Sequence, residues 1–467
     1  MSNHKAADFF KKLEGQRVAV CGIGRNNIPV VHQFLNYGAV VTACDRRTRE
    51  ELGGTADELE KAGAALCLGE NYLDSLAETR SDLILRTPGM KPYLPQFEEA
   101  RSRGVTVTSE MELFFSLCPA KITAVTGSDG KTTTTTIIAG LLEAAGYRVH
   151  LGGNIGRPLL PIINEIMPED EVVIELSSFQ LTGMKQSPHT AVITNIAPNH
   201  LDWHTDMQEY VDAKKNLFKW QNSADRIVLN ADESYTTGFA GEAVGQLYMF
   251  SRNAKPDRGA WLSQDGIITM TKDGQDTRIL PANDILIPGV HNIENYLAAI
   301  SAVWGKVAPD LIPDYAKEFG GVPHRCEFVR KLEGVKWYND SMGSSPSRTI
   351  AGLKSFDRKV ILIAGGYDKH IPYTPLGETA QNTVKAAILL GATAGAIEKA
   401  IREYSSLPIY RVGSMEEAVK TASKIATSGD IVFMSPASAS FDMYKNFEER
   451  GNHFKSLVAE IQTRKDD

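Results

Sequence analysis

The sequence predicts three α/β domains in succession, each built on a parallel sheet with helices on both faces. Short apolar runs typical of buried strands alternate with helix-like stretches along almost the whole chain. Two of these runs lead directly into glycine-rich turns, the arrangement that precedes a phosphate-binding helix. With 467 residues the chain also exceeds a single ordinary core, since a domain usually has about 100–200 residues. The predicted fold class is therefore doubly wound α/β, with a Rossmann-like first domain, a central P-loop ATPase-like domain and a Rossmann-like third domain.

The first predicted domain covers residues 1–108. Its strands are predicted from apolar runs at 17–22, 40–45 and 81–85, the first of which is followed by a glycine turn and a helix. Thr55 and Glu58 have the spacing of a capping box, so a helix is predicted to begin at Thr55.

The second predicted domain covers residues 109–321. Strands are predicted at 121–125, 171–175 and 191–194, and the first of them runs into a glycine loop and a threonine-rich helix over 132–145. A further helix is predicted over about 207–220. The turn-rich segment 232–281 predicts small strands that decorate this domain.

The third predicted domain covers residues 322–467 and repeats the strand–helix alternation. Strands are predicted at 335–338, 359–363, 386–390 and 430–434, and Ser414 is predicted to cap a helix. The glycines and proline of 320–323 indicate a hinge. In sheets of this kind, ligands are expected at the carboxyl ends of the strands and in clefts between domains.

The composition limits the class of protein. A net charge of −7 argues against a general nucleic-acid binder, although single loops can still bind small anions. The five cysteines are scattered and never form a C-x-x-C pair, which favours reduced thiols over a disulfide framework or a zinc site. The first residues lack the apolar region of a signal peptide, and no apolar run reaches the roughly 20 residues of a membrane span. We therefore expect a cytoplasmic protein without a membrane span.

The glycine loop between residues 126 and 132 predicts a nucleotide phosphate site. Backbone N–H groups and a helix N-terminus would face the phosphates, Lys131 would reach the transferred group, and Thr132 would hold Mg²⁺. A chance turn with a surface lysine would be the bland explanation, and the flanking strand and helix disfavour it. The predicted ATP-binding residues of the loop are Gly127, Ser128, Asp129, Gly130, Lys131, Thr132 and Thr133.

The compressed glycine spacing of this loop resembles the Mur ligase family and its folylpolyglutamate synthase relatives. Seven further motifs stand in the order of that family: Gly152-Gly-Asn154-Ile-Gly156, Glu175-Leu-Ser-Ser-Phe-Gln180, Asn199-His200-Leu-Asp202, Tyr210-x-x-Ala-Lys214, Gly289-Val-His-Asn292, Pro323-His-Arg325 and Asn339-Asp340-Ser341. The resemblance implies an ATP-dependent ligase that activates a carboxylate as an acyl phosphate and joins it to an amine.

The resemblance also implies a metal site and a catalytic set. Thr132, Glu175 and His200 would bind two Mg²⁺ ions, and Lys214 would support the second ion after CO₂ converts its amine into a carbamate. Lys131, Glu175, His200 and Lys214 are the predicted catalytic residues, with the general base left open. Taken singly, Glu175 could be an edge residue, His200 a helix-start residue and Lys214 a surface lysine. Asn292, Arg325 and Asp340 would complete the nucleotide site when the domains close.

The first glycine turn has a second interpretation. Gly22-Ile-Gly24 after a strand, with Asp45 ending the next strand, is similar to a dinucleotide fingerprint in which Asn27 replaces the third glycine. An NAD-dependent dehydrogenase is thus a candidate from another class. The family resemblance instead implies binding of a UDP-sugar by Gly24, Arg25, Asn26, Asp45, Arg46, Thr87, Pro88 and Gly89, with Asn154 orienting phosphate or substrate.

The C-terminal segment 435–451 resembles the D-glutamate-adding members of the family. Their glutamate contacts match Ser440, Phe447 and Lys369, which implies UDP-N-acetylmuramoyl-L-alanine and D-glutamate as substrates of a monomer. One departure is Met342, because many such ligases have a lysine there. We hypothesise that Ser344, Ser345, Arg348 or Lys369 compensates. The sequence also leaves open an L-alanine-adding ligase, a folylpolyglutamate synthase-like ligase and a non-catalytic nucleotide-binding regulator.

Overall fold

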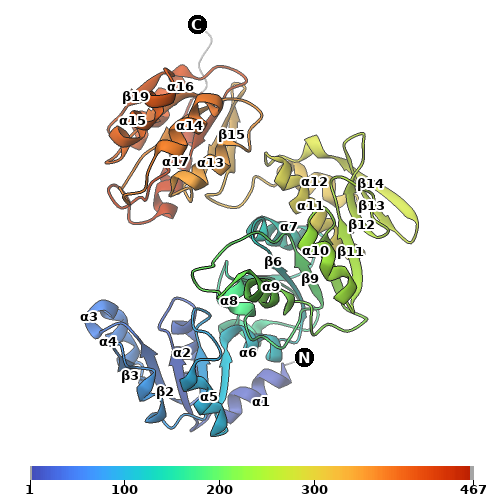
Figure 1. Ribbon diagram of the computed structural model, residues 1–467, viewed down its shortest axis with the longest axis vertical. Helices are drawn as coiled ribbons and strands as arrows, with labels where there is room; N and C mark the ends of the chain where they lie inside the picture. Colours follow the sequence, from blue (N-terminus) through green and yellow to red (C-terminus); the bar gives the residue numbers. More distant parts are fainter. Residues whose placement is uncertain (1–2, 463–467) are drawn as a thin grey trace. The chain divides into compact units, whose positions relative to one another are not determined.

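The computed structural model describes residues 3–462, and Figure 1 labels its helices and strands. The chain divides into two compact units. Unit 1 contains residues 1–280 and 294–313, and unit 2 contains residues 281–293 and 314–467. No helix within residues 3–462 is both long and apolar enough to cross a membrane.

Unit 1 begins with a parallel sheet in the order β3-β2-β1-β4-β5. Apolar side chains cover both faces, which is why its strands read as continuous apolar runs. One face packs against α2 (Asn27–Asn36) and α4 (Gly54–Lys61), and the other against η1 (Asp74–Ala77) and α5 (Pro95–Ser102). The strands are β1 (Arg17–Cys21), β2 (Val40–Asp45), β3 (Ala65–Leu68), β4 (Leu83–Arg86) and β5 (Thr106–Ser109), accompanied by α1 (His4–Lys12), α3 (Arg49–Leu52) and α6 (Glu110–Leu117).

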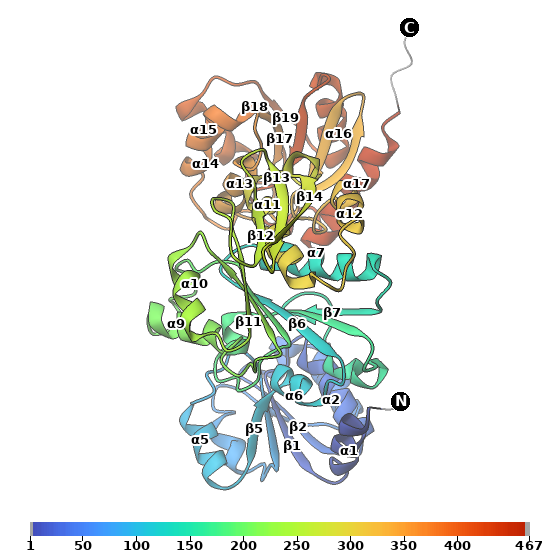
Figure 2. The same ribbon diagram turned by 90° about the vertical axis from the view of Figure 1, so that its right-hand side faces the viewer.

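The second sheet of unit 1 is also parallel and has the order β11-β10-β9-β6-β8-β7. Figure 2 shows β6 and β7 with α7, which contacts both strands. The elements are β6 (Lys121–Thr126), α7 (Lys131–Ala144), β7 (Val149–Gly153), η2 (Leu160–Glu165), β8 (Glu171–Glu175), α8 (Ser178–Leu181), β9 (Thr190–Ile193), α9 (Met207–Lys215), β10 (Arg226–Asn230), α10 (Ser234–Phe239), η3 (Ala240–Glu242) and β11 (Gln246–Phe250).

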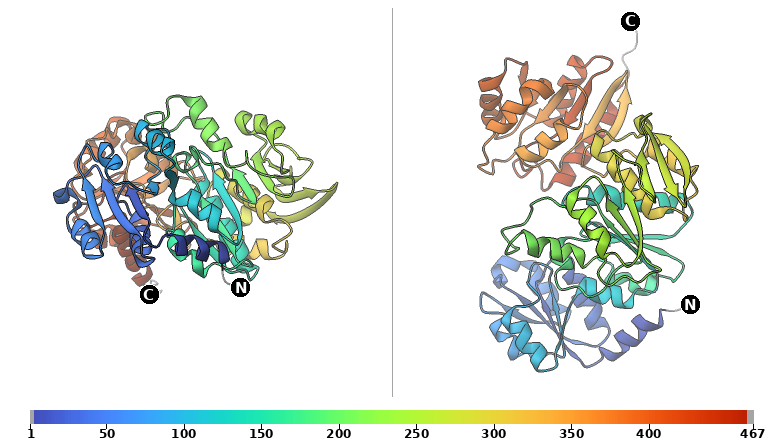
Figure 3. Two further views of the ribbon diagram at one scale, coloured as in Figure 1. Left: turned by 90° about the horizontal axis from the view of Figure 1, so that it is seen from below. Right: turned by 45° about the vertical axis from the view of Figure 1, so that its right-hand side comes forward.

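A small third sheet has the order β12-β13-β14, and β12 and β13 pair in antiparallel fashion. Both views of Figure 3 show these yellow-green strands on the side of unit 1 remote from β1–β5. The strands are β12 (Gly259–Leu262), β13 (Ile267–Lys272) and β14 (Gln275–Pro281), and they are followed by η4 (Ala282–Asp284), α11 (Val290–Val303) and α12 (Leu311–Glu318).

Unit 2 holds a mixed sheet in the order β15-β16-β20-β17-β18-β19, in which only the β15–β16 pair is antiparallel. Helices α13, α14 and α15 pack on one face, and α16 and α17 pack on the other. The elements are β15 (Glu327–Leu332), β16 (Val335–Asn339), α13 (Pro346–Leu353), β17 (Val360–Ala364), α14 (Thr374–Thr383), β18 (Val384–Leu389), α15 (Ala394–Tyr404), β19 (Ile409–Arg411), α16 (Met415–Ile425), β20 (Ile431–Met434) and α17 (Phe447–Glu460).

The predicted strands are confirmed to within a few residues, and so are the threonine-rich helix and the cap at Ser414, whose side chain accepts from the N–H of Glu417. The small strands predicted in 232–281 are also present. All five cysteines are free thiols. The domain boundaries near Thr108 and Gly321 stay predictions.

Two helix boundaries were predicted wrongly. The helix α4 begins at Gly54 without a side-chain cap, and the capping box lies instead at Thr48 and Glu51, before α3. The sequence contains two Thr-x-x-Glu segments, Thr48–Glu51 and Thr55–Glu58. Only the first forms the two reciprocal hydrogen bonds of a capping box. Helix α9 ends at Lys215 and not near Trp220, because residues 216–220 continue as turns rather than as α-helix.

Candidate functional site

A glycine loop joins β6 to α7 in unit 1. Gly127 has a φ of +150° and Gly130 a φ of +77°, backbone conformations that residues with side chains rarely adopt. A Cβ atom on Gly127 would also clash with the hydroxyl of Thr194, and one on Gly130 would clash with the side-chain oxygen of Asn295. Both backbone conformation and space therefore require glycine at these two positions.

Asn195, just beyond β9, holds this loop in place. Its side-chain oxygen accepts from the N–H of Asp129 at 2.9 Å, and its main-chain oxygen accepts from the N–H of Ser128 at 2.9 Å. These two amides are thus bound to protein. The first-turn N–H groups of α7 have no acceptor inside the helix, and this turn contains Lys131, Thr132 and Thr133. An anion at this helix end would meet these donors and the positive end of the helix dipole.

Thr132, Glu175 and Asn154 converge beside the loop. The hydroxyl of Thr132 donates to Oε2 of Glu175 at 2.7 Å, and the side-chain amide of Asn154 donates to its Oε1 at 2.8 Å. Glu175 is only 1% exposed at the end of β8. The structure thus joins Asn154, predicted beside the UDP-sugar residues, to the phosphate loop. A buried carboxylate next to a hydroxyl supplies the hard oxygen ligands that Mg²⁺ prefers.

Lys214 points from α9 into the same region. Its side chain is 1% exposed, and its Nζ donates to the carbonyl of Gly127 at 2.8 Å and to the hydroxyl of Thr126 at 3.2 Å. Burial lowers the pKa of Lys214 well below its usual range, and repulsion from the Lys131 ammonium adds to that effect. Lys214 is thus not a surface lysine, and its functional role stays a prediction. The adjacent Lys215 instead forms an ion pair with Glu242 at 2.6 Å.

His200 lies on the loop after β9, with a φ of +55°. A non-glycine residue in this conformation is uncommon, and such positions gather at functional sites. The imidazole contacts the ring of Phe179 at a centroid distance of 4.8 Å. Among the described residues, no hydrogen bond joins the His200 imidazole to Thr132, Glu175 or Lys214. No group of three or more His, Cys, Asp and Glu side chains within residues 3–462 is placed to hold a metal.

The first sheet reverses its strand order between β1 and β4, and the predicted UDP-sugar residues lie at the carboxyl ends of its strands. Gly22 has a φ of +95°, and a Cβ atom there would clash with the side chain of Thr87. Asp45, which is 8% exposed, accepts from the N–H of Ile23 at 2.7 Å and from the guanidinium of Arg47 at 3.0 Å. Burial opposes ionisation of Asp45, but the hydrogen bonds and charge of Arg47 outweigh it and lower its pKa.

The other predicted residues of the UDP-sugar site lie on the turns that follow β1, β2 and β4. Gly24, Arg25 and Arg46 are exposed, and Asn26, Thr87 and Pro88 are half-buried. The sequence did not distinguish Arg47 from Arg46, because only the turn after β2 decides which guanidinium folds back onto Asp45. Asn27 fills the place of a third glycine by donating from its side chain to the carbonyl of Gly22 at 2.9 Å.

In unit 2, Asp340 lies at the end of β16 and is 5% exposed. It accepts from the hydroxyl of Ser435 at 2.6 Å and from the N–H of Cys326 at 3.1 Å. Burial raises the pKa of Asp340 to about 6, although these donors and the charge of Arg325 act in the opposite direction. Asn292 is buried and donates to the carbonyl of Pro288 at 2.6 Å. The roles of Asn292, Arg325 and Asp340 at a nucleotide stay predictions.

The predicted glutamate-binding residues of unit 2 form two groups. Arg348 donates to the carbonyl of Met342, the residue that departs from the family pattern, at 3.2 Å. Lys369 donates to the carbonyl of Ser344, two residues further along the same loop, at 3.4 Å. Ser345 follows in the same loop and its hydroxyl lies 3.2 Å from that of Ser347.

Ser440 and Phe447 form the second group, which is organised by Arg450. This arginine is 1% exposed and donates to the carbonyls of Ser438, Ala439 and Ser341 at 3.2, 3.0 and 2.8 Å. It thereby ties the loop of Ser440 to the loop that follows Asp340. Burial lowers the pKa of Arg450 to about 10. Nothing in the local sequence singles out this arginine, because its partners lie on separate loops.

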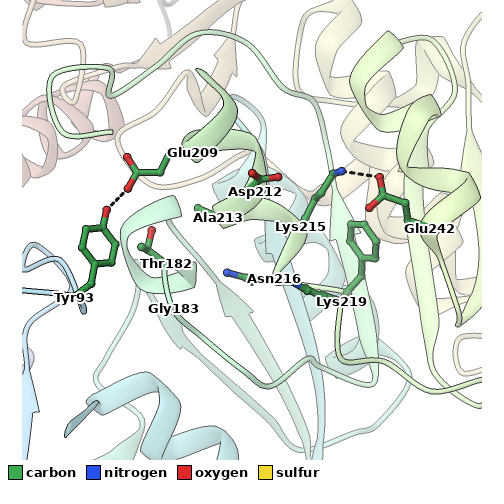
Figure 4. A pocket seen from close by; sticks show the side chains of 11 residues that line it. Tyr93, Thr182, Gly183, Glu209, Asp212, Ala213, Lys215, Asn216, Lys219 and Glu242 are labelled. Atoms are coloured by element: carbon green, nitrogen blue, oxygen red, sulfur yellow. Dashed lines mark hydrogen bonds and ion pairs between the residues drawn. The ribbon is translucent and has the colours of Figure 1, made fainter. Parts of the chain in front are cut away.

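A hollow of about 460 Å³ lies on another side of α9. Figure 4 shows side chains that line it. Ala213 and Lys215 line it, whereas Lys214 between them contacts the glycine loop. Tyr93 and Glu209 close one end of the hollow by a hydrogen bond, and Lys215 and Glu242 close the other. None of the residues predicted to bind substrate or metal lines it.

Comparison with known proteins gives two family matches and several close relatives. Residues 125–303 match the Mur ligase middle domain, and residues 324–438 match the Mur ligase, glutamate ligase domain. The UDP-N-acetylmuramoylalanine–D-glutamate ligase of Acetivibrio thermocellus is 52% identical over 98% of this chain and 100% of its own. Proteins of that name from Ruminiclostridium cellulolyticum (49% identical; 98% and 100% covered) and Clostridium kluyveri (46% identical; 97% and 99% covered) follow.

Solved structures share the fold at low identity. The UDP-N-acetylmuramate-alanine ligase MurC of Thermotoga maritima has a TM-score of 0.55 at 17% identity, covering 95% of this chain and 99% of its own. The MurF ligase of the same organism, in complex with ADP, has a TM-score of 0.53 at 18% identity, with 96% of each chain covered. The predicted three-domain α/β fold class is confirmed.

Proposed function

This chain belongs to the Mur ligase family, and we propose that it is an ATP-dependent ligase that joins D-glutamate to UDP-N-acetylmuramoyl-L-alanine in the synthesis of peptidoglycan precursors. The observation that carries the proposal is the 46–52% identity, over 97–98% of this chain, to three ligases named for that reaction. An NAD-dependent dehydrogenase is excluded by the same matches.

The reaction begins when the substrate carboxylate attacks the γ-phosphorus of ATP, forming an acyl phosphate and ADP. The amine of D-glutamate then attacks the acyl carbon, and the tetrahedral adduct loses phosphate to leave the amide. Lys131 and the first-turn N–H groups of α7 neutralise charge on the transferred group, and the fixed loop orients it. Glu175 and Lys214 are buried beside the loop, whereas Lys131 and Thr132 are half-buried and can reach a bound phosphate.

The metal ligands in this proposal are Thr132 and Glu175, with His200 and Lys214 for a second Mg²⁺. Bound Mg²⁺ would supply positive charge at the phosphate oxygens. The buried carboxylate of Glu175, which accepts a hydrogen bond from the half-buried Thr132 hydroxyl, supports this assignment. A carbamate on Lys214 requires an uncharged amine to add to CO₂, and burial favours that uncharged form.

The two substrates would bind at separate strand ends. The crevice around Gly22, Asp45 and Thr87 suits the UDP moiety, because it lies where the first sheet reverses its order. Arg348 and Lys369 supply positive charge beside Ser344 for the carboxylates of D-glutamate, where Met342 cannot. Ser440 and Phe447 complete that subsite.

The remaining parts of the proposal concern organisation. We propose three domains, 1–108, 109–321 and 322–467, in a monomeric cytoplasmic enzyme. The cytoplasm is where ATP and UDP-sugars are available together.

Phosphate release tests this function. The full-length chain, incubated with Mg·ATP, UDP-N-acetylmuramoyl-L-alanine and one amino acid at a time, is expected to release phosphate with D-glutamate and to form a product heavier by one glutamate residue. Omitting the UDP-substrate is the control. Phosphate release with other amino acids but none with D-glutamate would refute the proposal. Turnover of UDP-N-acetylmuramate with L-alanine would instead identify the L-alanine-adding activity.

A further inference from the structure

A junction within unit 1 links the loop after β4 to the first turn of α9 and the loop before it. We call it the Trp203 junction, and it consists of Gly89, Lys91 and Tyr93 on one side and Trp203 and Glu209 on the other. The predicted functional residues do not include Lys91, Tyr93, Trp203 or Glu209. Their contacts join segments more than 100 residues apart in the chain, since Gly89 and Trp203 are 114 positions apart.

Trp203 makes the central contact of the junction. Its indole N–H donates to the carbonyl of Gly89 at 2.9 Å, and the Lys91 ammonium lies over its ring at 5.1 Å from the centroid. A directed hydrogen bond and a cation–π contact therefore act on one side chain.

Glu209 makes the second contact. Its carboxylate accepts a hydrogen bond from the Tyr93 hydroxyl, as Figure 4 shows, and lies 3.5 Å from the Lys91 ammonium. It also accepts from the N–H of Thr205 at 2.5 Å, which fixes the carboxylate at the start of α9. Burial opposes ionisation, but the Tyr93 and Thr205 hydrogen bonds and the Lys91 charge prevail and lower the pKa of Glu209 to about 2. The carboxylate is thus charged at neutral pH.

Each side of the junction continues into one of the proposed substrate sites. Gly89 belongs to the loop proposed to bind the UDP-sugar. On the other side, the ring of Phe179 contacts both Trp203 and His200, each at a centroid distance of 4.8 Å. The residue after Glu209 is Tyr210, whose hydroxyl lies 2.8 Å from that of Ser128 in the glycine loop.

The loop after β4 is held firmly enough to transmit a displacement. Arg86 is 1% exposed and donates to the carbonyls of Met90 at 3.2 Å and Thr182 at 3.1 Å. A Cβ atom on Gly183 would lie 2.8 Å from the ring of Pro92, so the two segments are closely packed. Close-packed contacts of this kind transmit strain instead of absorbing it.

We infer that Trp203, Tyr93 and Glu209 are positioning residues that couple binding of the UDP-sugar to the position of the ATP phosphate loop. The inference rests on the proposed function. A UDP-sugar that displaces the loop of Gly89 shifts Trp203 and the start of α9 with it, and through Phe179 and Tyr210 this shift favours one arrangement of His200 and the glycine loop. Because coupling between two sites is reciprocal, bound ATP must then tighten binding of the UDP-sugar by the same factor.

Calorimetry measures that factor directly. UDP-N-acetylmuramoyl-L-alanine is titrated into the full-length chain with and without Mg²⁺ and a non-hydrolysable ATP analogue, and the ratio of the two dissociation constants is the coupling factor. For the unmodified chain we expect roughly fivefold or more, the lower end of typical allosteric coupling. Trp203→Phe, which removes the N–H donor and keeps an aromatic ring, is expected to bring the factor close to one.

The matched control is Trp220→Phe. The indole of Trp220 also donates to a backbone carbonyl, that of Met184 at 3.2 Å, and its side chain is half exposed. Within residues 3–462, no hydrogen bond, ring contact or cation–π contact joins it to the loop after β4. This variant is expected to retain the coupling factor.

Tyr93→Phe is expected to lower the coupling factor, as Trp203→Phe does. The double variant is expected to lower it no further than the stronger single change, because the effects of residues in one linkage are not additive.

Turnover supplies a readout that a purely structural role would not move. Trp203→Phe and Tyr93→Phe are expected to lower kcat for phosphate release and leave KM for D-glutamate unchanged.

Equal coupling factors in Trp203→Phe and Trp220→Phe, or a factor of one in the unmodified chain, overturn the inference. If Trp203→Phe does not fold, Tyr93→Phe decides, because Tyr93 is 48% exposed. An unmodified chain that shows coupling but releases no phosphate with D-glutamate refutes the proposed reaction and not the junction.

Discussion

At the level of single residues, the glycines at the two ends of α7 differ in the space that surrounds them. Gly130 precedes the helix with a φ of +77° and Gly146 follows it with a φ of +88°. A Cβ atom on Gly130 would clash with Asn295, whereas one on Gly146 would meet nothing within 4 Å. Gly146 therefore requires only an unusual backbone conformation, and Gly130 requires that conformation and the space as well.

Replacing these glycines separates the two requirements. Gly146→Ala is expected to lower the free energy of unfolding by about 1–2 kcal/mol, the cost of a left-handed backbone with a side chain. Gly130→Ala is expected to lower it by roughly 1–3 kcal/mol more, since Asn295 must move. ATP binding should weaken only in Gly130→Ala. Urea unfolding and ATP titration measure the two effects, and equal losses in both variants would show that the Asn295 contact is unimportant.

At the scale of elements, a buried carboxyl group joins helix α6 to η2. Glu110 is 5% exposed at the start of α6, and it accepts from the N–H of Leu160 at 3.1 Å. Burial raises the pKa of Glu110 to about 7, and the backbone donors only partly oppose this effect. The folded chain therefore keeps a proton that the unfolded chain releases at lower pH.

This proton makes stability depend on pH. Because the folded pKa lies above the unfolded value, the contribution of neutral Glu110 is fully present below about pH 4.5 and is lost as pH rises to about 7, with a total of about 3 kcal/mol. Glu110→Gln keeps a neutral acceptor, so the variant is expected to gain stability relative to the unmodified chain between about pH 5 and pH 8. Thermal unfolding across that range measures the difference, and a difference that does not change with pH contradicts the buried neutral form.

At the scale of the whole molecule, each of the two units has a buried arginine that ties its loops together. Arg86 in unit 1 and Arg450 in unit 2 are both 1% exposed, and both donate mainly to backbone carbonyls. Separate cores allow the two units to unfold in separate steps.

Arg450→Met and Arg86→Met form a matched pair. Each change leaves buried carbonyl oxygens without donors and is expected to cost its own unit about 3–5 kcal/mol. Arg450→Met should lower the unfolding transition of unit 2 and raise KM for D-glutamate. Arg86→Met should lower the transition of unit 1 instead. Hydrogen exchange followed by mass spectrometry assigns each loss to a unit, and a loss spread evenly over both units would contradict their independence.

Features that depend on local pattern can be predicted from the order of the residues alone. Apolar runs such as 121–125 and 359–363 mark strands because burial on both faces of a parallel sheet leaves no polar alternation. Gly127 and Gly130 mark the loop that is predicted to bind an anion, because its backbone conformation admits few other residues at these two positions. Neither signal needs knowledge of any distant segment.

Contacts between residues that are distant in the chain become visible only in the folded protein. Lys214 and Lys215 are neighbours in the chain, yet one is buried against the glycine loop and the other pairs with Glu242. The structural roles of Asn195 and Arg450 are evident only from their hydrogen-bond partners, which come from other loops. A side chain's environment depends on the packing of elements that lie far apart in the chain, and no local pattern records that packing.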